Sequence, residues 1–146
     1  MPQIYLAAPF FSDEQIDRAK RIESALDANP TVKDYYSPRQ NQKTENPEFS
    51  APWAAEVFQR DVTNVMAADI IVSVIDYRDN DAYSGTAFEQ GMAWVAKKPI
   101  VVVNELQFPV NLMLSESLTA YVTAAEALKT YNFEQTPKIP FTGELF

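Results

Sequence analysis

Short apolar segments alternate with segments of helical hydrophobic spacing along the whole chain. The clearest apolar run is 69–76 (DIIVSVID), and similar runs occupy 3–8 and 99–104. Apolar runs without polar alternation are typical of strands that are buried on both faces of a parallel sheet. Weaker runs at 31–37 and 118–123 bring the prediction to five strands.

The segments between these strands have the apolar spacing of amphipathic helices. Ser12 and Gln15 form a capping-box pattern that begins the first helix, and Asn29-Pro30 ends it. A second helix is predicted over 51–68, a third over 85–97 and a short fourth over 124–131. Apolar residues at helical spacing are Trp53, Val57, Phe58, Val62, Val65 and Met66 in the second helix, and Phe88, Met92 and Val95, expected to face inward, in the third.

The order of these elements predicts an α/β fold, a single-domain flavodoxin-like three-layer sandwich with a five-stranded parallel sheet. The length of 146 residues fits one domain, and 47% apolar with 22% charged residues is an ordinary globular composition. Ligands of such sheets bind beyond the carboxyl ends of the strands. This rule directs attention to the segments 8–12, 76–89 and 104–113.

Missing residue types narrow the possible chemistry. The chain has no Cys and no His, which excludes disulfides, thiolate nucleophiles, Ser-His-Asp triads and imidazole metal sites. Three glycines cannot build a P-loop or a dinucleotide fingerprint. The net charge of −8 argues against a nucleic-acid partner. No apolar run spans a membrane and no basic signal region opens the chain, so we expect a cytoplasmic protein.

Glu89 and Tyr5 are candidate site residues with an ordinary alternative each. Glu89 lies in the first turns of a helix that follows the third strand, where the helix N-terminus favours an ionised carboxylate suited to be a nucleophile. Thr86 and Glu89 also fit a capping box, which needs no catalysis. Tyr5, near the carboxyl end of the first strand, is on pattern alone more often a core residue.

Two other groups also allow two interpretations. Phe10 and Phe11 directly follow the first strand, and they either clamp a flat ring or form the hydrophobic staple of the next helix. Asp76, Asp79 and Asp81 crowd one loop. A solvated loop explains these carboxylates, and their spacing does not match a calcium loop, so we predict no metal site.

Short segments in a consistent order along most of the chain resemble one enzyme family. The two strongest are 85–91 (GTAFEQG) and 109–113 (PVNLM). Weaker matches are Ile4-Tyr5 with Phe11, the Gln42 loop, Gln59-Arg60-Asp61 and the tail 141–146. Together they resemble the nucleoside 2-deoxyribosyltransferases, and the resemblance implies that residues 1–146 form a single domain of this type.

The resemblance implies an enzyme that transfers the 2-deoxyribosyl group of a 2′-deoxynucleoside to an acceptor nucleobase. Glu89 would attack C1′ to form a covalent deoxyribosyl-enzyme, which a second base would then resolve. Two inversions give retention, as in retaining glycosidases. Tyr5 would orient Glu89 through its hydroxyl. The resemblance implies no cofactor and a role in nucleotide salvage and deoxyribonucleoside metabolism.

The remaining substrate contacts are also implied by the resemblance. A neighbouring subunit would supply Asn111 and Met113, which implies a homohexamer built as three dimers with shared active sites. The terminal carboxylate of Phe146 would help to hold the 5′-hydroxyl. Phe10 and Phe11 would pack on the base or sugar, while Gln42 and Asp61 would hydrogen-bond the base.

This chain departs from the family at one position. The family places an Asp just before the residue pair that here begins at Ser84, and this chain has Tyr83 there. The leaving base must gain a proton, and an acid near it contributes about 10²–10⁴-fold. Asp81 is the candidate replacement, and the choice between Asp61 and Asp81 stays open.

Two other functions remain as alternatives. A hydrolase of deoxynucleosides or their monophosphates would use water as acceptor on the same scaffold. Arg39 and Lys43 offer phosphate contacts in one loop, but no Ser/Gly-rich phosphate cradle accompanies them. A non-enzymatic flavodoxin-like binding module would want Ser, Thr or Gly after the first strand, where this chain has APFF at 8–11.

Overall fold

The computed structural model describes residues 1–78 and 81–146. Its centre is one sheet of five parallel strands in the order β2-β1-β3-β4-β5, which confirms the predicted fold class. Each strand is shorter than its apolar run, because pairing with the neighbouring strands stops before at least one end of the run. The strands are β1 (Gln3–Ala7), β2 (Asp34–Tyr36), β3 (Ile70–Val74), β4 (Ile100–Val103) and β5 (Ala120–Val122).

The helices follow the predicted order with two differences. A short helix interrupts the segment 105–116, which was expected to be a loop. The predicted fourth helix over 124–131 is a 3₁₀ helix. The helical segments are α1 (Asp13–Ala28), η1 (Pro38–Gln40), α2 (Ala51–Ala67), α3 (Ser84–Val95), α4 (Leu112–Ser115) and η2 (Ala125–Lys129).

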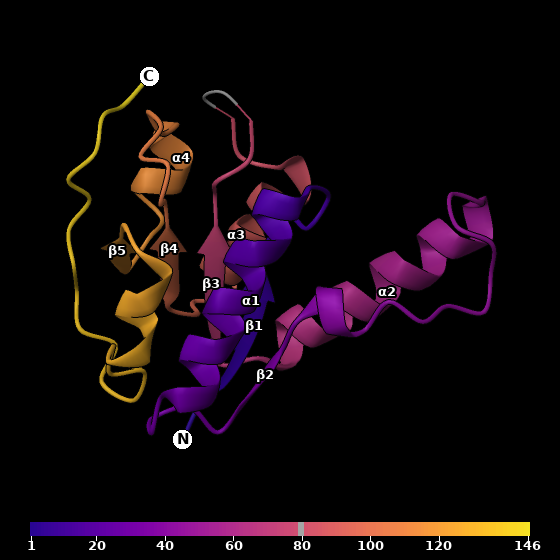
Figure 1. The fold of residues 1–146 in the computed structure, drawn as a ribbon, viewed down its shortest axis with the longest axis horizontal. Coiled ribbons are helices and arrows are strands. Elements are labelled where there is room, and N and C mark those ends of the chain that lie inside the picture. Colours follow the sequence, from indigo (N-terminus) through magenta and orange to yellow (C-terminus); the bar gives the residue numbers. More distant parts are fainter. Residues whose placement is uncertain (79–80) are drawn as a thin grey trace.

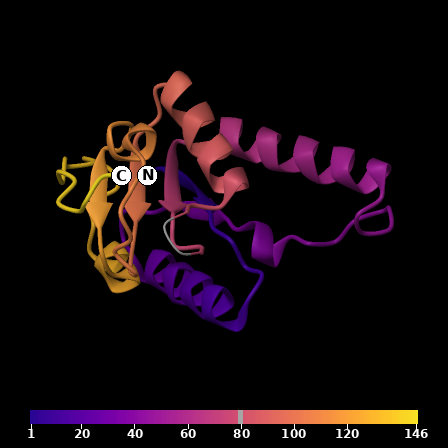
Figure 2. The same ribbon diagram turned by 90° about the horizontal axis from the view of Figure 1, so that it is seen from above.

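Helices cover both faces of the sheet, as Figure 2 shows from above. α1 and η2 pack on one face, over Ile4, Leu6 and Val72. α3, with α2 beside it, packs on the other face, over Tyr5 and Val102. Alternate residues of β1 therefore serve opposite layers, and the side chain of Tyr5 faces the α2/α3 layer. No helix of the described residues is long and apolar enough to cross a bilayer.

The start of α1 is capped as predicted. The Ser12 hydroxyl accepts a hydrogen bond from the Gln15 N–H at 3.2 Å, and the Gln15 side chain accepts one from the Phe11 N–H at 2.8 Å. These bonds fix the backbone that leaves β1. The Phe11 side chain is 58% exposed, so it does not serve as a buried staple.

The predicted inward face of α3 is confirmed for Met92, which packs partly buried against the core, and is wrong for Phe88 and Val95. Phe88 and Val95 are exposed, and the residues that face the sheet are Thr86, Gln90 and Ala93. These three share one face at i, i+4 and i+7, and their small or polar side chains allow the helix to lie close to the strands. Phe88, Trp94 and Val95 consequently point outward.

α2 extends away from the rest of the molecule (Figure 1). Within this helix only Val65 is buried, although its apolar residues have helical spacing. Phe58 is exposed and approaches Phe88 of α3 with ring centroids 6.1 Å apart. An apolar helix face left open to solvent is typical of a surface that binds another chain.

A buried amide fixes the rotation of α3. Gln90 is 1% exposed, and its Oε1 accepts a hydrogen bond from the Ser73 hydroxyl at 2.6 Å. Its Nε2 donates to the Leu114 carbonyl at 3.0 Å and to the Ser117 hydroxyl at 2.8 Å. Because a buried amide is costly to leave unpaired, this arrangement specifies how the helix lies on β3.

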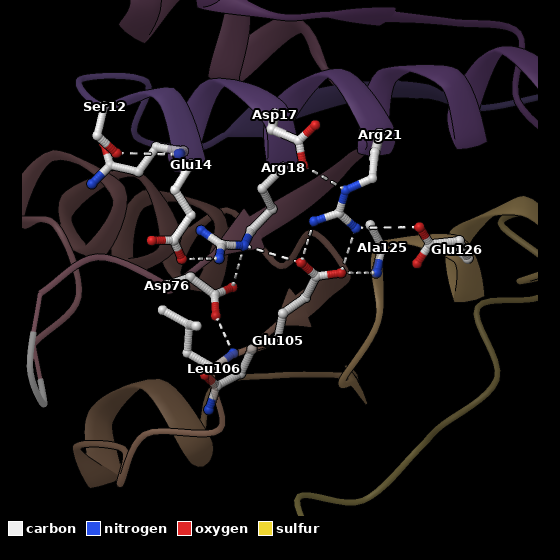
Figure 3. Close-up of polar contacts among 12 residues, drawn as sticks. Ser12, Glu14, Asp17, Arg18, Arg21, Asp76, Glu105, Leu106, Ala125 and Glu126 are labelled. Atoms are coloured by element: carbon white, nitrogen blue, oxygen red, sulfur yellow. Dashed lines mark hydrogen bonds and ion pairs between the residues drawn. The ribbon is translucent and has the colours of Figure 1, made fainter.

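A charged network joins α1 to the carboxyl ends of β3 and β4 (Figure 3). Arg18 donates to Glu14 at 2.7 Å and to Glu105 at 3.1 Å, and its Nε lies 3.8 Å from Asp76 Oδ2. Asp76 is fully buried and accepts from the Leu106 N–H at 2.6 Å. The network therefore holds the loop after β4 in place.

The C-terminal tail is extended and lies along the edge of β5 (Figure 1), as its prolines and aromatic residues predict. The Ile139 carbonyl accepts from the Tyr121 N–H at 3.0 Å. Further along, the Val110 N–H donates to the Glu144 carbonyl at 2.8 Å, and the Phe146 N–H donates to the Val110 carbonyl at 3.3 Å. The tail thus ends next to the loop that carries Asn111.

Candidate active site

Tyr5 and Glu89 meet on the α2/α3 face of the sheet. The Tyr5 hydroxyl donates a hydrogen bond to Glu89 Oε2 across 84 positions of sequence. Tyr5 is completely buried at the middle of β1, not near its carboxyl end as expected, and its ring stacks on Tyr36 at 5.8 Å. Burial, and then the charge of Glu89, raise the pKa of Tyr5 far above its usual value. The hydroxyl therefore keeps its proton and remains a donor.

Glu89 has a raised pKa, contrary to the expectation of a stabilised anion. Burial raises the pKa of Glu89 to about 7, the hydrogen bond from Tyr5 opposes this, and the charge of Asp61 adds to it. α3 begins at Ser84, so Glu89 lies in its second turn, beyond the reach of the helix N-terminus. The capping-box interpretation is also wrong, because Thr86 lies inside the helix and the N-cap is Tyr83.

Asp61 of α2 belongs to the same cluster. Burial raises its pKa, and its charge contributes to the raised pKa values of both Tyr5 and Glu89. Among the described residues Asp61 Oδ1 has no hydrogen-bond partner, and Arg60 Nε is 3.9 Å away, too far for a hydrogen bond.

Two further buried polar atoms beside Asp61 lack partners among the described residues. They are Arg60 Nε and the Tyr36 hydroxyl; burial raises the pKa of Tyr36, the charge of Arg60 opposes this, and the charge of Asp61 adds to it. Native proteins leave few buried polar groups unpaired. The three atoms lie in one group, of which Asp61 acts electrostatically on Glu89, and such a group is typical of a site that binds polar atoms of a ligand.

Aromatic rings line the approach to this cluster. The Phe11 ring lies 4.9 Å from that of Tyr83 and 6.3 Å from that of Tyr77. Phe10 stacks on Phe11 at 5.8 Å. The Tyr83 pKa is raised by burial, then by Tyr77, and also by the charges of Glu89 and Asp61. Tyr83 thus links the aromatic group to the two carboxylates electrostatically.

A second group of predicted residues lies elsewhere. Asn111, Met113 and Phe146 line a pocket of about 630 Å³ together with Asp81. Asn111 caps α4 by accepting from the Met113 N–H at 2.8 Å. Among the described residues, neither Tyr5 nor Glu89 lines this pocket. The structure therefore separates the expected site residues of one chain into two places.

The remaining predicted residues are not brought to either place. Gln42 is exposed, and its amide donates to the Arg39 carbonyl at 2.7 Å. Of the crowded acidic residues, Asp76 is buried in the α1 network and Asp79 lies outside the described residues. Within the two described ranges, no group of three or more acidic residues is arranged to hold a metal ion.

Three residues of the site were not identified as site residues from the sequence. Tyr36 was assigned only to a weak strand, and Arg60 was noticed only within the Gln59-Arg60-Asp61 match. Tyr83 was treated as a departure from the family pattern. One signal was available for Tyr36, because β2 pairs with β1 in register and places it beside Tyr5.

Comparison with known proteins identifies the family of the chain. The family model "Nucleoside 2-deoxyribosyltransferase" matches residues 4–134. A nucleoside deoxyribosyltransferase of Limosilactobacillus fermentum is 29% identical over 95% of this chain and 90% of that protein. Another, of Lactobacillus johnsonii, is 27% identical over 88% of this chain and 92% of that protein.

A solved structure extends the agreement to three dimensions. The 2-deoxyribosyltransferase of Bacillus psychrosaccharolyticus is 33% identical, with a TM-score of 0.83 over 95% of this chain and 98% of that chain. The family match covers the strands, the helices and every residue of the Tyr5–Asp61–Glu89 cluster. The chain belongs to the nucleoside 2-deoxyribosyltransferase family.

Proposed function

We propose that this enzyme transfers a 2-deoxyribosyl group between nucleobases by retaining double displacement through Glu89. The observation that carries the proposal is the partly buried Glu89 carboxylate, which accepts a hydrogen bond from Tyr5 and lies within electrostatic range of Asp61, whose Oδ1 has no hydrogen-bond partner among the described residues. A carboxylate in such a cluster can be held toward one reacting carbon while the unpaired groups bind the substrate.

Both half-reactions use the same carboxylate. In the first, a Glu89 oxygen forms a bond to C1′ while the C1′–N bond breaks, and the electron pair leaves with the base. In the second, a nitrogen of the acceptor base forms a bond to C1′ and the electron pair returns to Glu89. Only the ionised carboxylate can attack, so a pKa of about 7 places the necessary ionisation in the neutral range.

The leaving base needs a proton, and Asp61 is better placed to supply it than Asp81. Burial raises the pKa of Asp61, so its carboxyl holds a proton more readily than an exposed one. Asp61 also lies within electrostatic range of Glu89, whereas Asp81 is exposed and lines the other pocket. We propose Asp61 as the acid in the first half-reaction and the base in the second.

Base exchange tests the activity directly. Deoxyinosine and adenine are mixed with the enzyme, and all products are followed by chromatography. Transfer yields deoxyadenosine and hypoxanthine in equal amounts. Free deoxyribose without deoxyadenosine would instead identify a hydrolase, and no change in either compound would contradict both activities.

We further propose that the active site is completed by a neighbouring subunit in a homohexamer built as three dimers. Met113 is 70% exposed and Phe146 60% exposed beside Asn111. The outward faces of α2 and α3 add exposed Phe58, Met66, Phe88, Trp94 and Val95. Exposed apolar surface of this extent is typical of an interface between copies.

Mixed oligomers of two inactive variants are expected to recover activity. Glu89→Ala removes the carboxylate, and Asn111→Ala removes a group that would act in the neighbouring site. After joint dissociation and reassembly, a mixed dimer contains one site with both groups intact. Random pairing then gives about a quarter of the wild-type activity. No activity in oligomers proven to be mixed would show that Asn111 acts in its own chain.

We also propose that the terminal carboxylate of Phe146 helps to bind the sugar. The tail is anchored through the Glu144 and Val110 backbone, while the Phe146 side chain stays exposed. A short C-terminal extension moves the carboxylate without removing any aromatic residue. It is expected to lower transfer about tenfold, whereas an N-terminal extension of equal length leaves transfer unchanged.

Thermal unfolding of both extended proteins gives the control for this experiment. Equal midpoints exclude a folding defect as the cause of lost transfer. Full activity of the C-terminally extended enzyme would leave the tail a purely covering role.

We place the whole activity in nucleotide salvage within deoxyribonucleoside metabolism, in the cytoplasm.

A further inference from the structure

We propose that Tyr83 is a specificity-determining residue of this enzyme, which contacts the nucleobase with its ring and its neutral hydroxyl. This inference rests on the proposed function. At this position of the site, the chain has a phenol and not a third carboxylate. The expected consequence is a site that accepts bases with an amino edge and bases with an oxo edge alike.

The Tyr83 ring is part of an open aromatic surface. It lies 4.9 Å from Phe11 at an interplanar angle of 63°, and 5.2 Å from Tyr77 at 55°. Tyr83 is half-buried, whereas Phe11 is largely exposed. Edge-to-face contacts of this kind hold rings in defined orientations. A flat base that enters beside Phe11 therefore meets the Tyr83 ring as well.

Gly85 leaves room for the Tyr83 ring. A Cβ atom on Gly85 would lie 2.7 Å from Tyr83 Cε2, and the next two nearest atoms also belong to the Tyr83 ring. No glycine among the described residues has a positive φ, so the backbone conformation at Gly85 does not require a glycine. The missing side chain instead makes room for the ring. Tyr83 is thus seated over the first turn of α3, the helix that carries Glu89.

Tyr83 lies within electrostatic range of both carboxylates. The charges of Glu89 and Asp61 both act on its ionisation, after burial and Tyr77, and all of them keep the proton on the oxygen. A phenol hydroxyl both donates and accepts hydrogen bonds. It can therefore accept from an exocyclic amino group or donate to a carbonyl oxygen or ring nitrogen of the base.

A carboxylate at the same position would behave differently. It would place a third negative charge beside Glu89 and Asp61, which raises the pKa of its neighbours. When ionised it only accepts hydrogen bonds, and when protonated it donates one. Its preference for the edge of the base would thus depend on its protonation, whereas Tyr83 serves both kinds of edge without a change of charge.

The test compares Tyr83→Phe, Tyr83→Asp and the control Tyr35→Phe. Tyr35 is another half-buried tyrosine; it lies in β2, its hydroxyl is 3.3 Å from the Asp27 carboxylate, and it packs on the α1 face of the sheet. For each enzyme, kcat and KM are measured with deoxyadenosine and with deoxyinosine as donors to one common acceptor base. The pH dependence of kcat/KM is recorded for both donors.

We expect Tyr83→Phe to lower kcat/KM about tenfold for both donors, because one hydrogen bond to the base is lost. Tyr83→Asp is expected to change the ratio of the two donors about tenfold and to shift the rising limb of the pH profile upward. Tyr35→Phe should match the wild type in rate, ratio and profile. If Tyr83 had only a structural role, its replacement would change neither the ratio of kcat/KM between the two donors nor the pH of the rising limb.

The outcomes separate this inference from the proposed function. Wild-type enzyme that transfers, with Tyr83→Asp showing an unchanged donor ratio and an unchanged pH limb, would overturn the role of Tyr83 alone. Wild-type enzyme that transfers no deoxyribosyl group would overturn the proposed function and this inference together. Thermal unfolding midpoints confirm that each variant compared is folded.

Discussion

Glu89→Gln is expected to lose about 10⁴-fold in transfer while gaining stability at pH 8. The amide cannot form a bond to C1′ through a charged oxygen, which removes the first half-reaction. Its carbonyl can still accept the hydrogen bond from Tyr5, so the surrounding structure is retained. Initial rates of base exchange and urea unfolding at pH 5 and pH 8 measure the two effects.

The gain in stability follows from the raised pKa of Glu89. The carboxyl titrates near 4.5 in the unfolded chain and near 7 in the folded one. Between these values the folded state binds more protons, so wild-type stability falls as the pH rises, by about 3 kcal/mol in total. Gln does not titrate, and the variant avoids this loss above pH 7.

Asp13→Asn is a suitable control, since it changes an exposed carboxylate in the first turn of α1. It should keep transfer and lose up to about 0.5 kcal/mol, because a negative charge there favours the helix. Glu89→Gln with near wild-type transfer would eliminate Glu89 as the nucleophile. Equal stability of Glu89→Gln and wild type at pH 8 would contradict the burial of its charge.

Arg18→Met is expected to cost about 3–5 kcal/mol of unfolding free energy, the largest loss of stability that we predict. The Arg18 side chain is 5% exposed and has Glu14, Glu105 and Asp76 around it. Methionine fills much of the space but leaves Asp76 buried without its neighbouring cation. Urea unfolding at a fixed protomer concentration measures the loss, because association also contributes to stability.

Arg21→Met provides the matched control on the same helix. The Arg21 side chain is 36% exposed and also donates to Glu105, at 2.7 and 2.8 Å. Its loss is expected to cost about 1 kcal/mol, as for partly solvated ion pairs. Equal losses from the two variants would contradict the importance of burial at Arg18.

Acid should weaken the same network. Hydrogen bonds from Arg21 lower the pKa of Glu105 to about 2. The folded state therefore holds fewer protons than the unfolded state between about pH 2 and 4.5, and the stability that Glu105 supplies is lost as the pH falls through this range. The loss is complete only below the folded pKa.

The sheet could be predicted because its strands are uninterrupted apolar runs. The segments around β3 and β4 are apolar on both faces of the strand, so they are expected in a sheet that helices cover on both sides. Sheets of this kind are typically parallel, and the parallel arrangement was predicted for this reason. Helix faces were harder to predict. The expectation for α3 used its largest apolar residues, Phe88 and Val95, but close packing on the sheet selected the smaller Thr86 and Ala93 instead.

The cluster around Glu89 could be predicted only in part from the sequence. The proximity of Tyr5 and Glu89 came from the family resemblance, since no periodicity relates a strand residue to a helix residue 84 positions later. Asp81 was chosen for its nearness along the chain to Tyr83. The turn before α3 directs these two side chains to different places, and this depends on backbone geometry that spacing does not contain.

Trapping the glycosyl-enzyme tests the central claim most directly. A 2-fluoro-2-deoxy nucleoside slows both half-reactions, because fluorine destabilises the positive charge that develops at C1′. Intact mass and peptide mapping then locate any adduct. The account predicts one fluorinated pentosyl group per protomer on Glu89, released by an acceptor base. An adduct on another residue, or continued transfer of deoxyribose with no adduct, would contradict it.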